Sequence, residues 1–312
     1  MQAGIREFLQ TAAAKREHLQ NITNACRLCN GKADGLDGVV LDKYGTHYQI
    51  QFFNSEFLKF EAEIISAAKE LFAPHFLAIK YRMKDGDKFS RTAFGDNSKT
   101  VVEENGIKFA VDLMDTMNPG LFLDMRDARI FFAQKCAGRE VLNLFAYTCS
   151  FSVYARKHGA AKAVSVDISK KNLSKGKENF ALNDLSVLPG EFFCGSAEEY
   201  VDWCIKKEKR FGAIAIDPPS FSKNGKRIFK VADDAENLTS QAARILESDG
   251  ILLLASNYSE WDSGILQKTA ERAFAKNFKT CRILKRGTQG ADFPGCGEIR
   301  ESSMFYLVAS FI

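Results

Sequence analysis

The sequence lacks the long apolar runs that a membrane-spanning segment needs. Its longest apolar stretches, such as Ile251 to Ala255, have the length of a strand, far short of the roughly 20 residues that cross a bilayer. The N-terminus, MQAGIREFLQTAAAKREHLQ, is charged and helix-like, without the apolar segment and cleavage site of a signal peptide. Hydrophobic residues at 46% and charged residues at 26% are ordinary for a globular chain, so we expect a cytoplasmic protein without a membrane partner.

Metal-binding and phosphate-binding motifs are also missing. The 8 cysteines are scattered, and the single CxxC pair, Cys26 and Cys29, has neither a second pair nor suitably spaced histidines to complete a zinc site. On a regular strand these two cysteines would face opposite sides, so we expect no metal. The sequence contains no GxxxxGK[ST] and no GxGxxG, which argues against a P-loop hydrolase and against a dinucleotide cofactor.

The length of 312 residues favours two domains, and the patterns along the chain divide accordingly. Helical periodicity covers residues 2–20 and 55–72. Short β-like runs cover 38–42, 47–53, 76–81, 101–102 and 108–113, with a hairpin turn at 104–106. The polar, glycine-containing segment 84–99 is expected to be a mobile loop. These residues predict a small α+β domain over 1–115, a candidate for substrate binding.

Residues 116–312 predict a second domain with an α/β fold. Strand-like runs at 141–145, 163–166, 192–194, 213–216 and 251–255 alternate with helical sequence such as 150–157 and 170–182, and 304–312 is a final strand. This rhythm is typical of a doubly wound, mostly parallel sheet covered by helices on both faces. Ligands of such sheets bind at the carboxyl ends of the strands, so functional residues are expected there.

Polar and aromatic side chains follow three of these strands. Asn143 opens a loop, NLFAYTCSF, that has no glycine and therefore suits a cofactor with a ribose but no pyrophosphate. Asp167, at the tip of the second strand, is placed to accept hydrogen bonds from ribose hydroxyls, although capping the next helix is an equally good reading. Asp217-Pro218-Pro219-Ser220-Phe221 combines a rigid loop with an acceptor and a stacking face, which suits a planar base.

Together these motifs resemble the class I methyltransferases that modify bacterial large-subunit (23S) ribosomal RNA. The resemblance covers nearly the whole chain through five ordered segments: RLCNGKADGLDGVVLDKYG (27–45), NPGLFLDMRDAR (118–129), VLNLFAYTCSFSVYA (141–155), AVSVDIS (163–169) and AIDPPSFSK (215–223). It implies a seven-stranded methyltransferase sheet, S-adenosylmethionine as the cofactor and RNA as the partner, without a metal. The oligomeric state, monomer or homodimer, stays open.

The resemblance also implies roles for individual residues. Asp217, Pro218 and Phe221 would act at the target base, with Asp217 also beside the transferred methyl. The cofactor would be held by residues from five segments: Phe122, Asp124, Arg126, Asn143, Phe145, Tyr147, Thr148, Ser150, Phe151, Asp167, Ile168, Ser196, Ala197 and Asp217.

Two positions depart from the family pattern. Cys149 stands where these proteins usually carry glycine, which predicts a less tight loop. Ser196 stands where an aspartate often contacts the adenine amine, which puts that contact in doubt. Both departures favour an alternative in which the chain is a catalytically silent RNA-binding protein.

The choice between carbon 5 of cytosine and a nitrogen as the methylated atom depends on whether the reaction needs a nucleophilic residue of the enzyme. Methylation of cytosine carbon 5 requires a cysteine thiolate, and the corresponding run, Ser256 to Ser259, contains Asn257 but no cysteine. A nitrogen acceptor, preferably of guanine, needs only positioning, and it is our expectation. Methylation of cytosine carbon 5 stays an alternative, with Cys296 as the residue that would supply the thiolate. A small-molecule or protein substrate is a third possibility, because Lys and Arg exceed Asp and Glu only by 43 to 39.

Overall fold

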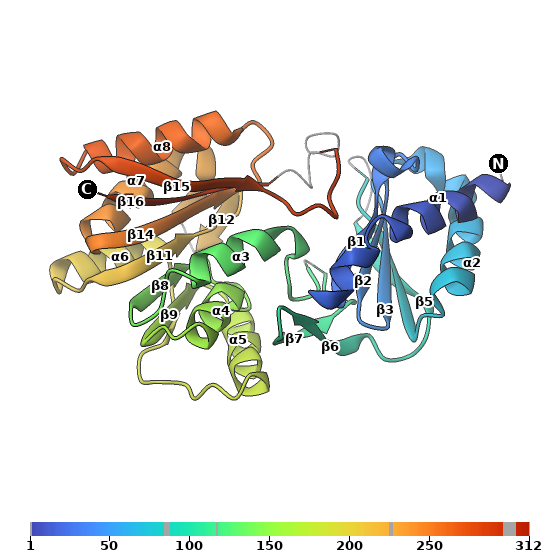
Figure 1. Cartoon of the computed structure of the whole chain (residues 1–312), viewed down its shortest axis with the longest axis horizontal. Coiled ribbons are helices and arrows are strands. Elements are labelled where there is room, and N and C mark those ends of the chain that lie inside the picture. Colours follow the sequence, from blue (N-terminus) through green and yellow to red (C-terminus); the bar gives the residue numbers. More distant parts are fainter. Residues whose placement is uncertain (1, 84–87, 117, 225–226, 296–303, 312) are drawn as a thin grey trace. The chain divides into compact units, whose positions relative to one another are not determined.

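The computed structural model describes residues 2–83, 88–116, 118–224, 227–295 and 304–311, and it divides the chain into two compact units (Figure 1). The first unit comprises Met1–Asp124 and Gly290–Ser302, and the second comprises Met125–Gln289 and Ser303–Ile312. The first unit therefore runs past residue 115 to Asp124 and also takes in a segment close to the C-terminus.

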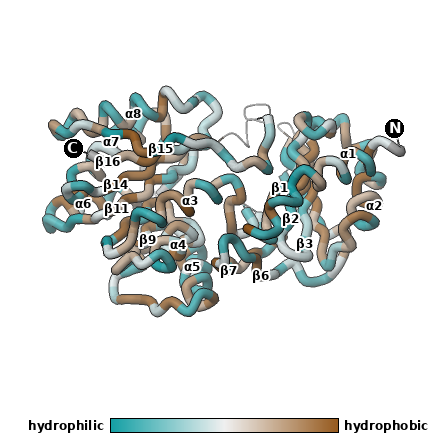
Figure 2. Tube along the Cα trace, in the orientation of Figure 1, coloured by the Kyte–Doolittle hydropathy of each residue, from teal (hydrophilic) through white to brown (hydrophobic). Residues whose placement is uncertain are grey.

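The first unit is built on a five-stranded sheet in the order β1-β2-β3-β4-β5. Its strands are β1 (Ala25–Asn30), β2 (Val39–Tyr44), β3 (His47–Phe52), β4 (Phe76–Tyr81) and β5 (Phe89–Phe94), and only β3 and β4 pair in parallel. Helices α1 (Gln2–Ala14) and α2 (Glu61–Phe72) share its hydrophobic core. Along α2 hydrophobic and hydrophilic residues alternate within the turns, as one buried face requires (Figure 2). A hairpin of β6 (Lys99–Glu104) and β7 (Ile107–Asp112) adds a separate two-stranded sheet.

Several local expectations for this unit were wrong. The helix expected over 2–20 ends at Ala14, and short 3-10 turns occupy 17–21, 31–34 and 55–60. The segment expected to be a loop contains β5, while its residues 84–87 lie outside the described part. A bulge between Arg27 and Cys29 shifts the β1–β2 register, so Cys26 and Cys29 enter the same hydrophobic core instead of facing opposite sides.

The second unit contains the seven-stranded sheet, in the order β10-β9-β8-β11-β14-β16-β15. These strands are β8 (Glu140–Leu144), β9 (Lys162–Asp167), β10 (Phe192–Cys194), β11 (Phe211–Ile216), β14 (Leu246–Ser256), β15 (Cys281–Thr288) and β16 (Phe305–Phe311). β8 to β11 and β14 run parallel, whereas β16 is antiparallel to both of its neighbours. The strand order reverses direction at β8, which creates the switch point where ligands of doubly wound sheets bind. The expected fold class is confirmed.

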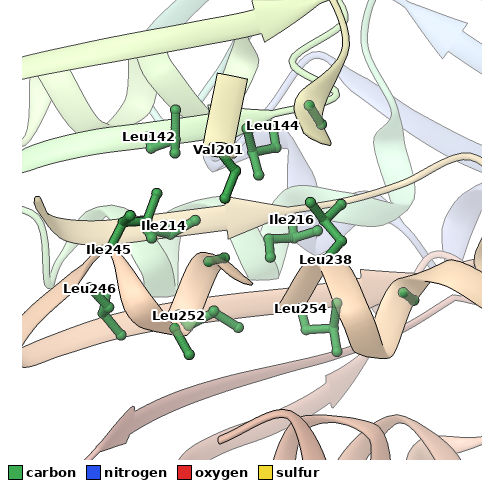
Figure 3. Close-up of a cluster of buried hydrophobic side chains, with 14 of the residues drawn as sticks. Leu142, Leu144, Val201, Ile214, Ile216, Leu238, Ile245, Leu246, Leu252 and Leu254 are labelled. Carbon is green, nitrogen blue, oxygen red and sulfur yellow. The ribbon is translucent and has the colours of Figure 1, made fainter. Parts of the chain in front are cut away.

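Helices cover both faces of this sheet. One face packs against α6 (Ala197–Lys206), α7 (Val231–Arg244) and α8 (Ser263–Ala275), and the other against α3 (Arg126–Ala133), which follows the 3-10 turn Leu123–Met125, and α4 (Ser150–Lys157). Helix α5 (Lys170–Leu182) follows β9. In Figure 3, Ile214 and Ile216 of β11 lie between the leucines of β8 and β14, beneath Val201 and Leu238. This fully buried core fixes the strand tips from which the functional loops emerge.

Candidate functional site

The loop after β8 has a strained backbone that compensates for its lack of glycine. Phe145, Tyr147 and Cys149 have φ angles of 57°, 49° and 63°, in the left-handed region that non-glycine residues occupy at a cost of about 1–2 kcal/mol each. Hydrogen bonds hold this conformation: Ala146 N donates to Val166 O at 2.9 Å, and Cys149 N donates to Ala146 O at 2.7 Å. Cys149 therefore adopts the left-handed conformation that glycine takes most easily, and hydrogen bonds of the loop hold it there.

Asp167 ties this loop to the tip of β9. Its carboxylate accepts hydrogen bonds from Tyr147 N at 2.9 Å, Ser169 N at 2.8 Å and the side chain of Asn172 at 3.2 Å. Burial raises the pKa of this carboxyl above its ordinary value, while the three donors act in the opposite direction. The cap of α5 is supplied by Ser169, whose Oγ accepts from Asn172 N, so capping that helix is not what Asp167 does.

A pocket opens at the carboxyl ends of β8, β9 and β10. It encloses about 270 Å³ of empty space, including space open to solvent, and its lining comes from five segments of the second unit: Phe145, Ile168, Ser196, Ala197, Glu198, Ser222 and Phe229. The rings of Phe145 and Phe229 lie 5.1 Å apart. The pocket has aromatic and aliphatic walls, and one of them is formed by Ile168, which follows Asp167 in the chain. Such walls suit a planar heterocycle joined to a sugar.

The structure brings together only part of the predicted cofactor set. Phe145, Ile168, Ser196 and Ala197 line the pocket. Asn143 instead donates to Ser152 Oγ at 3.0 Å from a buried position. The remaining predicted residues are not among those that line this pocket.

Phe151 and Arg126 are buried residues of helices, and Phe151 packs edge-on against Phe132 in the core. Thr148 is also buried, and its carbonyl accepts from Asn179 at 2.9 Å. Ser150 begins α4. Phe122 and Asp124 belong to the first unit.

The loop after β11 leads from the sheet to the pocket wall. Asp217 is half-buried, Pro218 is buried, and Phe221 is 56% exposed. Ser220 Oγ donates to Asn257 Oδ1 at 3.3 Å, which joins this loop to the residues after β14. Phe221 then begins a hairpin of β12 (Phe221–Asn224) and β13 (Arg227–Lys230), whose inner residues line the pocket.

Comparison with known proteins agrees with this geometry. Residues 21–296 match a family described as S-adenosylmethionine-dependent methyltransferase. This chain belongs to that family. Its cofactor is S-adenosylmethionine, as the sequence motifs predicted, and it is a methyltransferase.

Two curated relatives and one solved structure show how far the similarity extends. Ribosomal RNA large subunit methyltransferase I of Tolumonas auensis is 31% identical over 92% of this chain and 75% of its own length. Ribosomal RNA large subunit methyltransferase K of Neisseria meningitidis is 31% identical over 84% of this chain and 77% of its own length. The crystal structure of SMU.776 complexed with SAH has a TM-score of 0.90 and 26% identity, covering 99% of this chain and 81% of that one.

Both departures from the methyltransferase pattern have a structural explanation. The buried Sγ of Cys149 faces Gly176 on α5, where an added Cβ would lie only 2.4 Å away. The side chain of Cys149, at a position where the family usually has glycine, therefore occupies space that is left free because Gly176 has no side chain. Ser196 Oγ accepts a hydrogen bond from Glu199 N at 3.2 Å and caps α6, so this residue orients the helix that borders the pocket.

Sequence reasoning missed Glu198, Ser222 and Phe229 as pocket residues. The run FSKNGKRIFK does carry a hairpin signal, because a polar, glycine-containing break separates two alternating runs. Nothing in the sequence shows which face of that hairpin is buried. Cys296, the thiol considered for a cytosine reaction, lies outside the described residues.

In the described part of the chain, no group of three or more histidine, cysteine, aspartate or glutamate side chains is arranged to hold a metal ion. None of the helices described there combines the length and apolar character needed to cross a bilayer.

Proposed function

We propose that this chain transfers the methyl group of S-adenosylmethionine to a base of large-subunit ribosomal RNA, preferably to a nitrogen of guanine. The names of the relatives support the RNA class. The observation that carries the proposal is the path of residues 217–221, which connect the end of β11 to the wall of the pocket and present an exposed aromatic ring. A ribosomal RNA substrate implies a cytoplasmic enzyme.

The pocket would hold the adenine ring, between Phe145, Ile168 and Phe229. Asp167 would then take the ribose hydroxyls with carboxylate lone pairs that remain beside its hydrogen bonds to Tyr147 and Ser169. When bound, the cofactor supplies an electrophilic methyl group on a sulfonium centre.

Ser196 and Ala197 line the same pocket and would lie on its adenine side. The other predicted cofactor residues keep their proposed roles around the rest of the cofactor: Phe122, Asp124, Arg126, Asn143, Tyr147, Thr148, Ser150, Phe151 and Asp217. For Asn143, Phe151 and Thr148 the burial described above supports an indirect role, in which they fix the loop that contacts the cofactor.

The target base would be held by Asp217, Pro218 and Phe221. Pro218 fixes the backbone, Asp217 accepts a hydrogen bond from a base N–H, and Phe221 stacks on the ring. A nucleotide in structured RNA must leave its stack to reach this loop, and these contacts would offset that cost.

A nitrogen acceptor is favoured by the residues around this loop. Asn257, which contacts Ser220, belongs to the run Ser256 to Ser259, which contains no cysteine and corresponds by the family resemblance to the region that carries the thiol in the cytosine branch. Cys149 is fully buried, and burial raises the pKa of its thiol to about 12, so it is unsuited to nucleophilic attack. A ring or exocyclic nitrogen needs no covalent step, and in-line positioning supplies most of the rate enhancement.

The deciding experiment maps modified nucleosides by mass spectrometry in ribosomal RNA from a deletion strain and from the complemented strain. A methylated guanine that disappears and returns would support the proposal. Loss of 5-methylcytidine instead would contradict the nitrogen acceptor, and unchanged ribosomal RNA would contradict the substrate class.

Purified variants test the roles of the loop. Asp217→Ala should lower turnover about a hundredfold through lost orientation, with a much smaller effect on S-adenosylmethionine affinity. Phe221→Ala should mainly raise the RNA concentration for half-maximal rate. Phe278→Ala is the matched control, because Phe278 is a fully exposed phenylalanine of the same unit. If Asp217→Ala abolishes cofactor binding while Phe221→Ala leaves RNA use unchanged, the loop belongs to the cofactor pocket instead.

A further inference from the structure

The β12–β13 hairpin forms part of the wall of the pocket. Its antiparallel register places Ser222 opposite Phe229, and it pairs Phe221 with Lys230 and Lys223 with Ile228. Residues directly opposite each other in an antiparallel pair share a face, and successive residues alternate between faces. Ser222 and Phe229 line the pocket, and Phe229 is 4% exposed.

The opposite, outer face of the hairpin combines two apolar and two basic side chains. Phe221 and Ile228 are 56% and 48% exposed, and Lys223 and Lys230 are exposed as well. In this register Phe221 is a diagonal neighbour of Ile228, and Lys223 is a diagonal neighbour of Lys230. The two side chains of each pair can therefore contact the same ligand. Neither lysine has an ion pair with another described residue.

The base of the hairpin is anchored at both ends. Ser220, before β12, contacts Asn257, and the N–H of Lys230 donates to Asp234 Oδ2 at 2.8 Å in the first turn of α7. Phe229 adds an inward anchor by packing against Phe145. The outer face is therefore presented on a fixed support, which lowers the entropy lost when a ligand binds.

We infer that this outer face binds the single-stranded RNA next to the target nucleotide. Ile228 packs against a neighbouring base beside Phe221, while Lys223 and Lys230 neutralise the phosphates on either side. Cations interleaved with apolar stacking surfaces are the combination that single-stranded nucleic acids require. The inference rests on the proposed RNA substrate, and it adds Lys223, Ile228 and Lys230, which neither line the cofactor pocket nor hold the target base.

The lysine pair is tested by Lys223→Glu/Lys230→Glu, with Lys206→Glu/Lys207→Glu as the control. The control removes two exposed lysines of the same unit, so it imposes the same change of net charge. Binding and methylation of protein-free large-subunit ribosomal RNA are measured between about 50 and 200 mM salt, the range over which phosphate contacts weaken strongly. Calorimetric titration with S-adenosylmethionine measures the integrity of the pocket.

We expect the hairpin variant to raise the KM for RNA about tenfold or more at low salt. The slope of log affinity against log salt should become shallower by roughly 1.4, since each lost phosphate contact to a single strand contributes about 0.7. Turnover at saturating RNA and S-adenosylmethionine affinity should stay at the values of the control. Ile228→Ser should weaken RNA binding at every salt concentration and leave the slope unchanged, because it removes an apolar contact only.

Three outcomes would overturn the inference. Equal RNA affinity and slope in the hairpin and control variants would eliminate this face as an RNA-binding surface while leaving the proposed function intact. Loss of S-adenosylmethionine affinity in the lysine variant would show that the hairpin acts through the cofactor pocket. A wild-type protein that neither binds nor methylates ribosomal RNA would refute the proposed function and, with it, this surface.

Discussion

The contact between Cys149 and Gly176 makes a sharp prediction about the cofactor loop. Gly176 lies in the middle of α5 and is buried. In Gly176→Ala, the new Cβ would lie 2.4 Å from Cys149 Sγ, 3.0 Å from Cys149 Cβ and 3.2 Å from a ring carbon of Phe192. All three separations are shorter than van der Waals contact, so the loop or the helix must shift.

Two opposing effects set the magnitude. Replacing a helical glycine by alanine ordinarily stabilises a protein by about 1 kcal/mol, whereas overpacking a core costs about 1–3 kcal/mol. The 2.4 Å separation from Cys149 Sγ is far inside contact distance, so the cost here should lie in the upper part of this range, at about 2–3 kcal/mol. We therefore expect Gly176→Ala to lower the free energy of unfolding by about 1–2 kcal/mol. It should also weaken S-adenosylmethionine binding, because the displaced residue belongs to the loop that Asp167 holds.

A second substitution should reverse the effect. Cys149→Gly removes the clashing sulfur and suits the left-handed φ of 63°, so in this background Gly176→Ala should become neutral or stabilising by up to about 1 kcal/mol. The coupling energy of the double-mutant cycle should be about 2–3 kcal/mol. Urea denaturation gives the stabilities, and calorimetric titration gives the cofactor affinities.

Gly4→Ala in α1 is the control, because an added Cβ there would make only ordinary contact, 3.4 Å from a ring carbon of Phe8. Its effect on stability should be slightly favourable, and cofactor affinity should not change. The reasoning would be refuted if Gly176→Ala were as stable as the wild type, or if the two substitutions were additive within about 0.5 kcal/mol.

Three further predictions follow from the site and the first unit. Asp167→Ala should weaken S-adenosylmethionine binding by about 2–4 kcal/mol in calorimetry, and unchanged affinity would exclude the ribose role. RNA containing 5-fluorocytidine should yield no covalent adduct on denaturing gels, whereas an adduct lost in Cys296→Ser would favour the cytosine reaction. Lys80 is fully buried, and burial lowers its pKa from 10.5 to about 8. As the pH rises, the ammonium group of Lys80 therefore loses its proton at a lower pH in the folded chain than in the unfolded chain. Relative to Lys80→Met, the wild type should therefore gain up to about 3 kcal/mol of stability between pH 8 and 10.5 in urea titrations, and parallel pH profiles would contradict this.

Local sequence patterns were sufficient for most of the elements around the catalytic sheet. The helices predicted at 150–157 and 170–182 match α4 and α5, and in α5 the buried positions Leu173, Gly176 and Phe180 repeat at helical spacing. The buried strands were recognisable as short apolar runs between these helices, and the residues at their tips followed from the rule for parallel sheets. The weakly patterned strands β1, β5 and β15 were missed, because their pairing partners rather than their own residues hold them in place.

The sequence by itself determined the fold class, the cofactor and the order of the functional motifs, because these depend on local periodicity and on short motifs at fixed positions. Only the tertiary structure decided which residues complete the site. Gly176 compensates Cys149 from another helix, and Phe229 closes the pocket from a hairpin. Asp292 accepts a hydrogen bond from Arg27 N at 3.0 Å and joins the first unit from near the C-terminus. Each of these contacts joins residues that are distant in sequence, so it cannot be predicted from a local sequence pattern. Only the packing of the folded chain brings the partners together.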